Sequence, residues 1–336
     1  MPGLALQRLL DASLAYPPEY ANQLSSHLPM ALAALDGLGA GETRLCEFFV
    51  GYVRRFTTLA PASPAPALDW PALRGRIDGF AALCATFSAM LTRNGRDVVL
   101  REALPRLIDG VGGAAFHGVI RTAHAVESEH NGELAAALAY WAARWMPLAP
   151  PDTAQPDIDK VADWLDAIDS RARQDAPVWR SPAPLITGRM RDASGHPAYH
   201  GVAGRLRSTD RDPGALLYEL ALCAAGRYAA TRNFTVLHMA TAARALRVLA
   251  PWLAADPAAL APLWHAVAAA SLASGVATAA SVQAPADPSL DWNQVRARGL
   301  ASDDDHVIKL VHAMVVQDAF APNKVWLRAA ERAVVG

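Results

Sequence analysis

Cysteine is scarce in this 336-residue chain, and its scarcity excludes several classes of protein. The three cysteines, Cys46, Cys84 and Cys223, are far apart in the sequence and form no CxxC pair. A disulfide framework, a zinc finger or an iron–sulfur site would need more cysteines at closer spacing. Each cysteine has apolar neighbours, so we expect buried, reduced thiols in a cytoplasmic protein.

An excess of charge of one sign is also lacking. Lys and Arg number 31 and Asp and Glu 32, which gives a formal net charge of -1. A nucleic-acid-binding protein needs a basic face, so we expect no nucleic-acid partner.

The N-terminal segment MPGLALQRLL lacks the basic start and long apolar run of a signal peptide. Residues 258–286 carry no charged side chain, but they are mainly Ala, Ser, Gly and Val, so we predict a buried helix and no membrane span.

The motifs of several common enzyme classes are missing. The chain has no Walker A sequence, GxSxG elbow or HExxH. Gly37, Gly39 and Gly41 follow an expected helix instead of a strand, and the last glycine of the dinucleotide fingerprint is absent. We interpret these glycines as a helix terminus.

Aromatic residues make up only 7% of the chain, whereas Ala and Leu are abundant, and this composition favours helices over strands. Apolar residues recur at intervals of three and four along most of the sequence. The first two helices are expected to contain Leu6 to Leu10 and Leu24 to Leu35. The later helices are predicted over residues 43–57, 71–92, 98–108, 114–129, 132–146, 157–173, 213–230, 234–254, 257–280, 290–299, 304–318 and 322–334.

Strand signals are nearly absent, so we predict an all-α protein with a single large helical domain over residues 1–336. Pro- and Ala-rich segments at 57–69, 146–157, 181–197 and 284–289 are predicted to be long connections within that domain. An alternative is two helical lobes divided near residues 150–200. Residues 179–208 form the least regular segment, and loops of this length are often functional lids.

Several of the ten histidines fall on apolar faces of the expected helices. His27, His117 and His238 have apolar residues three or four positions away. His306 follows the acidic run 303–305, and Lys309 comes three residues later. Taken alone, each such histidine is more simply interpreted as a hydrogen-bonded core residue, and Lys309 as a solvated helix lysine.

The segment around His306 allows a more specific hypothesis. Asp303 or Asp304 can cap a helix N-terminus, and His306 and Lys309 then project from one half-buried face. A buried ammonium group is costly, so its pKa falls and it becomes a nucleophilic amine. Such an amine could react with carbon dioxide to give a carbamate, which is a good ligand for a divalent metal.

A second arrangement of metal ligands is open at this point. Glu127-x-x-His130 and Asp303-x-x-His306 match in part the motifs of di-iron helical bundles. Those bundles also need single glutamates from two further helices, and the sequence offers none on an apolar face.

Four segments of the chain resemble the questin oxidase-like family. They are SSHLPMALAAL around His27, AFHGVIR around His117, FTVLHMATAARAL around His238 and DDDHVIKLVH around His306. They occur in the same order as in the family, and the likeness extends from about residue 4 to about residue 334. Fungal members act on anthraquinones and related aromatic polyketides, and open their rings by Baeyer–Villiger-type or related oxygenation.

The resemblance implies an all-helical oxygenase with a mononuclear non-haem Fe(II) site. Carried over residue by residue, the ligands are His27, His117, His238 and His306, with carboxylated Lys309 as a further ligand. Such a set suits Fe(II) and leaves a position for O2. The resemblance also implies an apolar aromatic or ketone substrate and an external reductant such as NADPH.

Two further residues have expected roles near this site. We predict that Arg121 orients an anionic substrate or an adjacent carboxylate, with a purely structural arginine as the alternative. His312 is predicted to orient a metal-bound group through a hydrogen bond.

The sequence also allows two alternative functions. One is an inactive helical scaffold, with residues 258–286 as a homo-oligomer interface, and the other is a zinc-dependent hydrolase.

Overall fold

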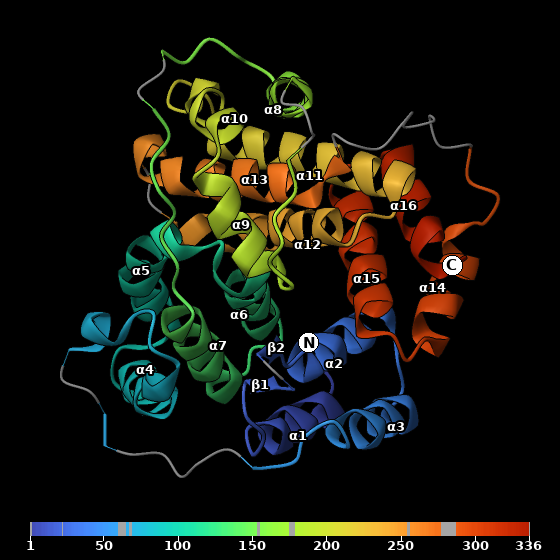
Figure 1. The fold of residues 1–336 in the computed structure, drawn as a ribbon. Helices are drawn as coiled ribbons and strands as arrows, with labels where there is room; N and C mark the ends of the chain where they lie inside the picture. Colours follow the sequence, from blue (N-terminus) through green and yellow to red (C-terminus); the bar gives the residue numbers. More distant parts are fainter. Residues whose placement is uncertain are drawn as a thin grey trace.

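The structure is a computed structural model that describes residues 2–21, 23–59, 65–66, 69–152, 155–174, 179–253, 256–276 and 287–335. Its regular structure is almost entirely helical over these residues, as predicted (Figure 1). One short antiparallel ribbon accompanies the helices, formed by β1 (Glu19–Tyr20) and β2 (Leu24–Ser25). The prediction of an all-α protein is therefore confirmed.

The N-terminal part contains α1 (Leu4–Ser13), α2 (Leu28–Leu38) and α3 (Glu42–Val53). Helix α2 ends at Gly39, whose φ of 96° lies in the left-handed region that glycine adopts without strain. The expected start of this helix at Leu24 is wrong, because Leu24 pairs with Tyr20 in the ribbon and the helix begins only at Leu28. Pro29 in the first turn favours that start, since proline fits where no backbone N–H is needed.

The other α-helices follow the predicted pattern with shifted ends. They are α4 (Phe80–Asn94), α5 (Arg96–Leu107), α6 (His117–Glu127), α7 (Asn131–Ala143), α8 (Val161–Arg173), α9 (Ile186–Ser194), α10 (Pro197–His200), α11 (Pro213–Thr231), α12 (Phe234–Leu249), α13 (Ala261–Ser274), α14 (Trp292–Ala301), α15 (Asp305–Phe320) and α16 (Lys324–Val334). Short 3-10 turns lie at η1 (Trp70–Leu73), η2 (Ile77–Gly79), η3 (Ile108–Gly110), η4 (Gly113–Phe116), η5 (Ala203–Arg205), η6 (Ala250–Trp252) and η7 (Pro257–Leu260).

Three expected elements need correction. The helix predicted over 71–92 is split, because η1 and η2 precede α4. The connection predicted over 181–197 contains α9 and the start of α10. The long helix predicted over 257–280 is α13, which ends at Gly275 in a left-handed conformation, and residues 277–286 lie outside the described part. Among the described residues, no helix has the length and apolar character needed to cross a membrane.

Four helices form a closed ring at the centre of the molecule. Helix α2 packs against α6 and α15, and α12 packs against the same two helices (Figure 1). The outer helices cover this ring, with α7 on α6, α11 and α13 on α12, and α16 on α15. One hydrophobic core runs from Leu6 in α1 to Ala333 in α16. The outer helices therefore shield much of the ring from solvent.

Candidate metal centre

The central ring brings together the four histidines that the sequence singles out. Each helix of the ring contributes one: His27 from α2, His117 from α6, His238 from α12 and His306 from α15. Around the ring, centroids of neighbouring imidazoles are 4.5, 5.0, 5.4 and 4.6 Å apart. Two imidazoles that bind one ion through bonds of about 2.1 Å have centroids roughly 4.5–5.2 Å apart. Three of the four spacings fall within this range and the fourth, between His238 and His306, is slightly wider; among the described residues, the donor atoms that lie within 4.8 Å of one another are those of His27, Asp305 and His306.

Each histidine lies near the N-terminus of its helix. His27 precedes the first residue of α2, His117 is the first residue of α6, and His306 is the second residue of α15. His238 is the fifth residue of α12. A helix N-terminus carries a partial positive charge, which disfavours protonation of an imidazole placed there. The convergence of four such ends favours neutral histidines, and neutral imidazole is the form that binds metal.

The Nδ1 atom of every one of these histidines contacts an acceptor. His27 Nδ1 lies 2.6 Å from an oxygen of Asp305, and His306 Nδ1 lies 2.9 Å from the same oxygen. His117 Nδ1 is 2.5 Å from the carbonyl oxygen of Ala114, and His238 Nδ1 is 2.8 Å from that of Phe234. Metal-binding histidines usually donate their second N–H to such a carboxylate or carbonyl oxygen. These contacts leave the four Nε2 atoms as the unprotonated nitrogens.

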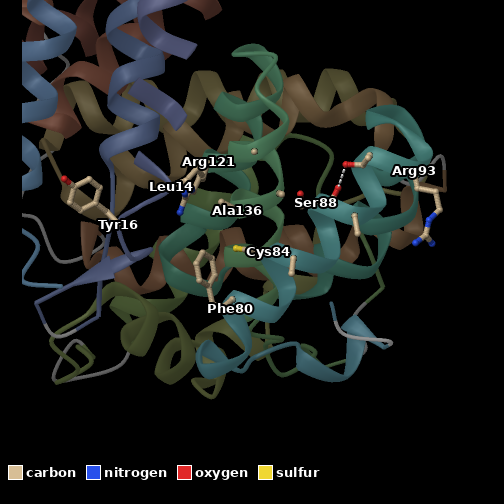
Figure 2. Close-up of a pocket in the computed structure, with 14 residues that line it drawn as sticks. Leu14, Tyr16, Phe80, Cys84, Ser88, Arg93, Arg121 and Ala136 are labelled. Atoms are coloured by element: carbon tan, nitrogen blue, oxygen red, sulfur yellow. Dashed lines mark hydrogen bonds between the residues drawn. The ribbon is translucent and has the colours of Figure 1, made fainter. Parts of the chain in front are cut away.

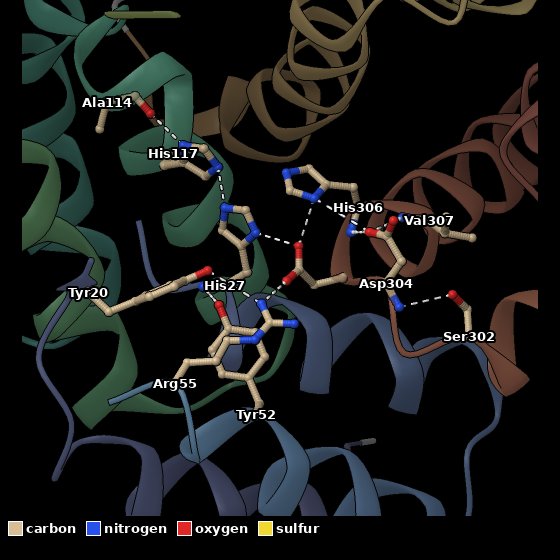
Figure 3. A network of polar contacts seen from close by, with 11 residues as sticks. Tyr20, His27, Tyr52, Arg55, Ala114, His117, Ser302, Asp304, His306 and Val307 are labelled. Carbon is tan, nitrogen blue, oxygen red and sulfur yellow. Dashed lines mark hydrogen bonds and ion pairs between the residues drawn. The ribbon is translucent and has the colours of Figure 1, made fainter. Parts of the chain in front are cut away.

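The contact between His27 and His117 is the observation that best indicates room for a cation in the cluster. Their Nε2 atoms face each other at 2.6 Å, and their rings are stacked with an interplanar angle of 20° (Figure 3). With both Nδ1 atoms acting as donors, two lone pairs would meet at this distance and repel. A cation shared by the two nitrogens removes that repulsion, so the residues present fit a metal ion.

Asp305 is the functional residue that sequence reasoning missed. Its side chain is buried between His27 and His306, and its second oxygen accepts a hydrogen bond of 2.9 Å from Arg55. His27, Asp305 and His306 also form a group whose ligand atoms lie within 4.8 Å of one another, so the carboxylate has access to an ion. Because both neighbouring Nδ1 atoms already donate to it, we assign Asp305 the role of orienting the two rings. The helix cap predicted at Asp303 or Asp304 is Asp304, which accepts from the N–H groups of His306 and Val307 (Figure 3).

The pKa values of the buried histidines and of Asp305 differ from the usual values in directions that suit metal binding. Burial, helped by the nearby Lys309 charge, lowers the pKa of His27 to about 3. Burial also holds the pKa values of His117 and His238 well below 6.5. Burial alone would raise the pKa of Asp305, but hydrogen bonds from His27 and His306 hold it below its usual range. Near neutral pH, His27, His117 and His238 are therefore neutral imidazoles, and Asp305 is a carboxylate.

Lys309 lies one turn along α15 from Asp305 and is 3% exposed. Burial lowers the pKa of its ammonium group to about 8, against the opposing effect of Asp305 and Asp304. Its charge is among the causes that lower the pKa values of His27, His117 and His238. The buried, easily deprotonated lysine expected from the sequence is present beside the cluster.

A turn of left-handed backbone positions His117. Ala114, Ala115 and Phe116 have φ values of 48°, 55° and 68°, which residues other than glycine rarely adopt. The turn directs the Ala114 carbonyl at the ring of His117 three residues later. The preceding Gly113 cannot be replaced without movement, because an added Cβ would lie 1.9 Å from the Arg144 carbonyl oxygen. Backbone strain of this kind is often retained where it orients a functional group.

A cavity of about 360 Å³ opens directly onto the histidines. Its walls include Leu24 from the ribbon, Phe234 from α12 and residues 184–187, which lead into the first turn of α9. Phe234 packs against His238 and His306, with centroids 4.8 and 4.7 Å apart. The segment 179–208, expected to be the least regular part of the chain, therefore supplies one wall of this cavity.

The structure places Arg121 and His312 away from the cavity at the four histidines. Arg121 forms two hydrogen bonds with Glu133, of 2.6 and 2.8 Å, in a buried ion pair. The ring of His312 packs against that of His124, with centroids 5.5 Å apart and planes tilted by 34°, and its Nε2 lies against Gly37. Neither residue lines the cavity above the four histidines.

The di-iron alternative is not supported by the contacts of its residues. Glu127 forms an ion pair with Arg244. His130 Nδ1 accepts a hydrogen bond from the Glu133 backbone N–H at 2.9 Å, and its Nε2 lies 3.0 Å from Asp11.

The three cysteines are free, as expected, but their side chains are half-buried instead of buried.

The fold and the site together define a class, an all-α protein with a cluster of four histidines, of which His27, His117 and His238 are buried and His306 is half-buried. The chain belongs to the questin oxidase-like family, whose family model matches residues 24–314. This match includes all four histidines, Asp305 and Lys309. The family's description indicates an oxidase. A comparison with curated proteins found none that matches.

Proposed function

We propose that this protein is a non-haem Fe(II) oxygenase that oxidises an apolar aromatic or ketone substrate with O2. The observation that carries the proposal is the closed ring of four imidazoles, each held by its Nδ1 atom with its Nε2 atom left for an ion. Nitrogen ligands of this kind suit iron better than calcium or magnesium, which prefer oxygen. Bound Fe(II) would supply the redox chemistry that activates O2.

The residues of the chain have separate tasks in this proposal. His27, His117, His238 and His306 bind the ion, and Asp305 fixes two of the rings while offsetting positive charge. Arg55 in turn orients Asp305. Tyr52 accepts a 2.7 Å hydrogen bond from the His27 N–H, which secures the start of α2.

Lys309 is proposed as a further ligand in its carboxylated form. Its neutral amine attacks carbon dioxide, the new N–C bond forms a carbamate, and one proton leaves to solvent. The lowered pKa of about 8 makes the neutral amine accessible near neutral pH. The carbamate would be an anion placed among helix N-termini, where negative charge is stabilised.

The cavity determines the proposed substrate class. Leu185, Ile186 and Phe234 give it largely apolar walls, which suit a ring system, while Gln23 and Arg189 add polar groups to the lining. A second cavity, of about 270 Å³, shares Gln23, Ala114 and Leu185 with the first. This second cavity is also lined by the charged residues Glu19, Arg144 and Arg191. The reducing equivalents are proposed to come from an external donor such as NADPH.

Metal analysis tests the proposal directly. The protein is purified without oxygen, loaded with Fe(II), desalted and analysed by mass spectrometry for bound metals. We expect one iron per chain in the wild type and almost none in His238→Ala. His265→Ala is the matched control, because His265 is a half-buried histidine on α13 outside the cluster.

The other outcomes separate the alternative functions. Zinc retained in preference to iron would favour a hydrolase. A protein that binds no metal after loading, but folds normally, would favour a helical scaffold. If iron binds, O2 consumption is then measured with NADPH and a panel of aromatic ketones, and no consumption above the His238→Ala background would contradict the oxygenase.

A further inference from the structure

The cavity at the four histidines and its neighbour of about 270 Å³ meet at the start of α9. The residues that line both cavities, and so lie between them, are Gln23, Ala114, Pro184, Leu185 and Thr187. Two arginines of α9 flank this boundary, because Arg189 lines the cavity at the histidines and Arg191 lines its neighbour. A ligand that reaches from one cavity towards the other therefore comes close to both guanidinium groups.

The charges around the two cavities do not cancel. No Asp or Glu is among the described residues that line the cavity at the histidines, and Glu19 is the one acidic residue listed by position in the lining of its neighbour. Glu19 forms an ion pair with Arg144, which lines the same neighbouring cavity. Arg189 and Arg191 have no ion-pair partner in the described part of the chain. The two linings together therefore carry two uncompensated positive charges.

The two arginines of α9 differ in what they already bind. The Nε and Nη2 atoms of Arg189 donate hydrogen bonds of 2.8 and 2.9 Å to the carbonyl oxygens of residues 183 and 184. These bonds fix the guanidinium group and the cavity wall, but they leave its charge uncompensated. Arg191 is exposed and donates no hydrogen bond to any residue that the structure describes. Asp192, the next residue, bonds to a serine hydroxyl and lines neither cavity.

Other charged groups are less available to a ligand. Arg55 forms an ion pair with Asp305 behind the histidine rings. Arg121 lines a separate cavity between α4 and α7 (Figure 2), and it is paired with Glu133. Lys309 is buried and lines neither of the two cavities at α9. The guanidinium group of Arg191, in contrast, is open to a cavity and has all its N–H groups free.

We propose that the substrate carries a carboxylate, which binds Arg191 while the apolar body of the substrate lies against Ile186 and Phe234. A guanidinium group binds a carboxylate through two parallel, charge-assisted hydrogen bonds. The fixed charge of Arg189 adds to the attraction of the anion. The inference rests on the proposed function in one respect, that the cavity at the histidines holds the substrate.

The test measures binding without turnover. The probes are naphthalenes that carry a carboxylate on a spacer of one, three or five methylene groups, and each is compared with its uncharged amide. Binding is measured by calorimetry at low salt, with a chelator present so that the carboxylate has no metal ion to bind. We expect the carboxylate with the best-fitting spacer to bind roughly five- to tenfold more tightly than its amide. In 0.5 M salt this preference should fall severalfold, because salt screens an exposed ion pair.

Two variants locate the bound charge. Arg191→Met should abolish the preference and leave the affinity of the amide unchanged, which shows that the variant is folded. Arg54→Met is the matched control and should keep the preference, because Arg54 is also exposed but lines neither cavity. Equal affinity of acid and amide at every spacer length would overturn the proposal. A preference that survives Arg191→Met, or that is lost in Arg54→Met, would also overturn it.

Failure of the carboxylate site is distinguishable from failure of the oxygenase. The binding test uses neither metal nor O2, so equal affinity of acid and amide would leave iron binding and O2 consumption untouched. Absence of iron binding or of O2 consumption would overturn the oxygenase, whereas the preference for the acid and its loss in Arg191→Met would still be measured.

Discussion

The buried pair His124 and His312 makes the protein sensitive to acid. Both side chains lie inside the four-helix ring, and the Nδ1 atom of each has no hydrogen-bond partner among the described residues. Burial and the nearby Arg244 charge hold both pKa values well below 6.5. Each histidine is therefore neutral in the folded protein at a pH where the unfolded chain is protonated.

The sign and size of the effect follow from proton linkage. Below pH 6.5 the unfolded state binds more protons than the folded state, so the free energy of unfolding falls as the pH falls. One histidine that is protonated only in the unfolded chain lowers the stability by about 2 kcal/mol at pH 5. For the two together the loss is about 4 kcal/mol, a large share of the stability of a typical domain.

Urea unfolding of the metal-free protein at pH 7 and pH 5, followed by circular dichroism, measures this loss. His124→Leu/His312→Leu replaces both groups with apolar side chains, and a chelator keeps the four cluster histidines metal-free in both proteins. We expect the wild type to lose about 4 kcal/mol more than the variant between the two pH values. Parallel curves for the two proteins would refute the assignment of neutral, buried imidazoles.

Three further predictions concern the site and the packing around it. Asp305→Asn should weaken iron binding roughly 10–100-fold in a metal titration, because His27 and His306 lose their orienting carboxylate; Asp303→Asn, at a side chain that is 85% exposed, should not. Lys309→Ala should abolish a carbamate signal in the ¹³C NMR spectrum of protein equilibrated with ¹³CO2, whereas Lys324→Ala should retain it; a wild type without the signal would contradict the carboxylated lysine. Gly118→Ala should lower the stability measured by thermal unfolding by about 1–3 kcal/mol, because its Cβ would lie 2.7 Å from the Cα of Trp141. Gly226→Ala, which meets nothing within 4 Å in α11, should instead raise stability by about 0.5–1 kcal/mol.

Much of the fold follows from local pattern. The helices are amphipathic or deeply buried, and their caps are local, as Asp304 at α15 and Gly39 at the end of α2 show. Spacing on apolar faces indicated the four histidines, but it did not predict that they meet. That expectation depended on the family resemblance; the structure places the four rings next to one another, and their role as metal ligands stays a prediction.

The missed features depend on contacts between distant segments. Asp305 looks like part of a capping run, and its role depends on His27, which is 278 residues away in the sequence. The left-handed turn at 114–116 contains two alanines, which favour a right-handed helix, so tertiary contacts must override their preference. Leu24 continues the helical pattern of α2, yet the chain pairs it with Tyr20.

The positions of the four histidines along the chain also determine at which stage of folding the site can form. They lie at positions 27, 117, 238 and 306, so the first and last are separated by most of the chain. An incomplete nascent chain that stops before α15 lacks His306, Asp305 and Lys309. All four ring helices must dock before the imidazoles converge, so an ion would enter an already folded protein, through the cavity beside Phe234. Loss of the ion would then leave the fold in place, ready to be loaded again.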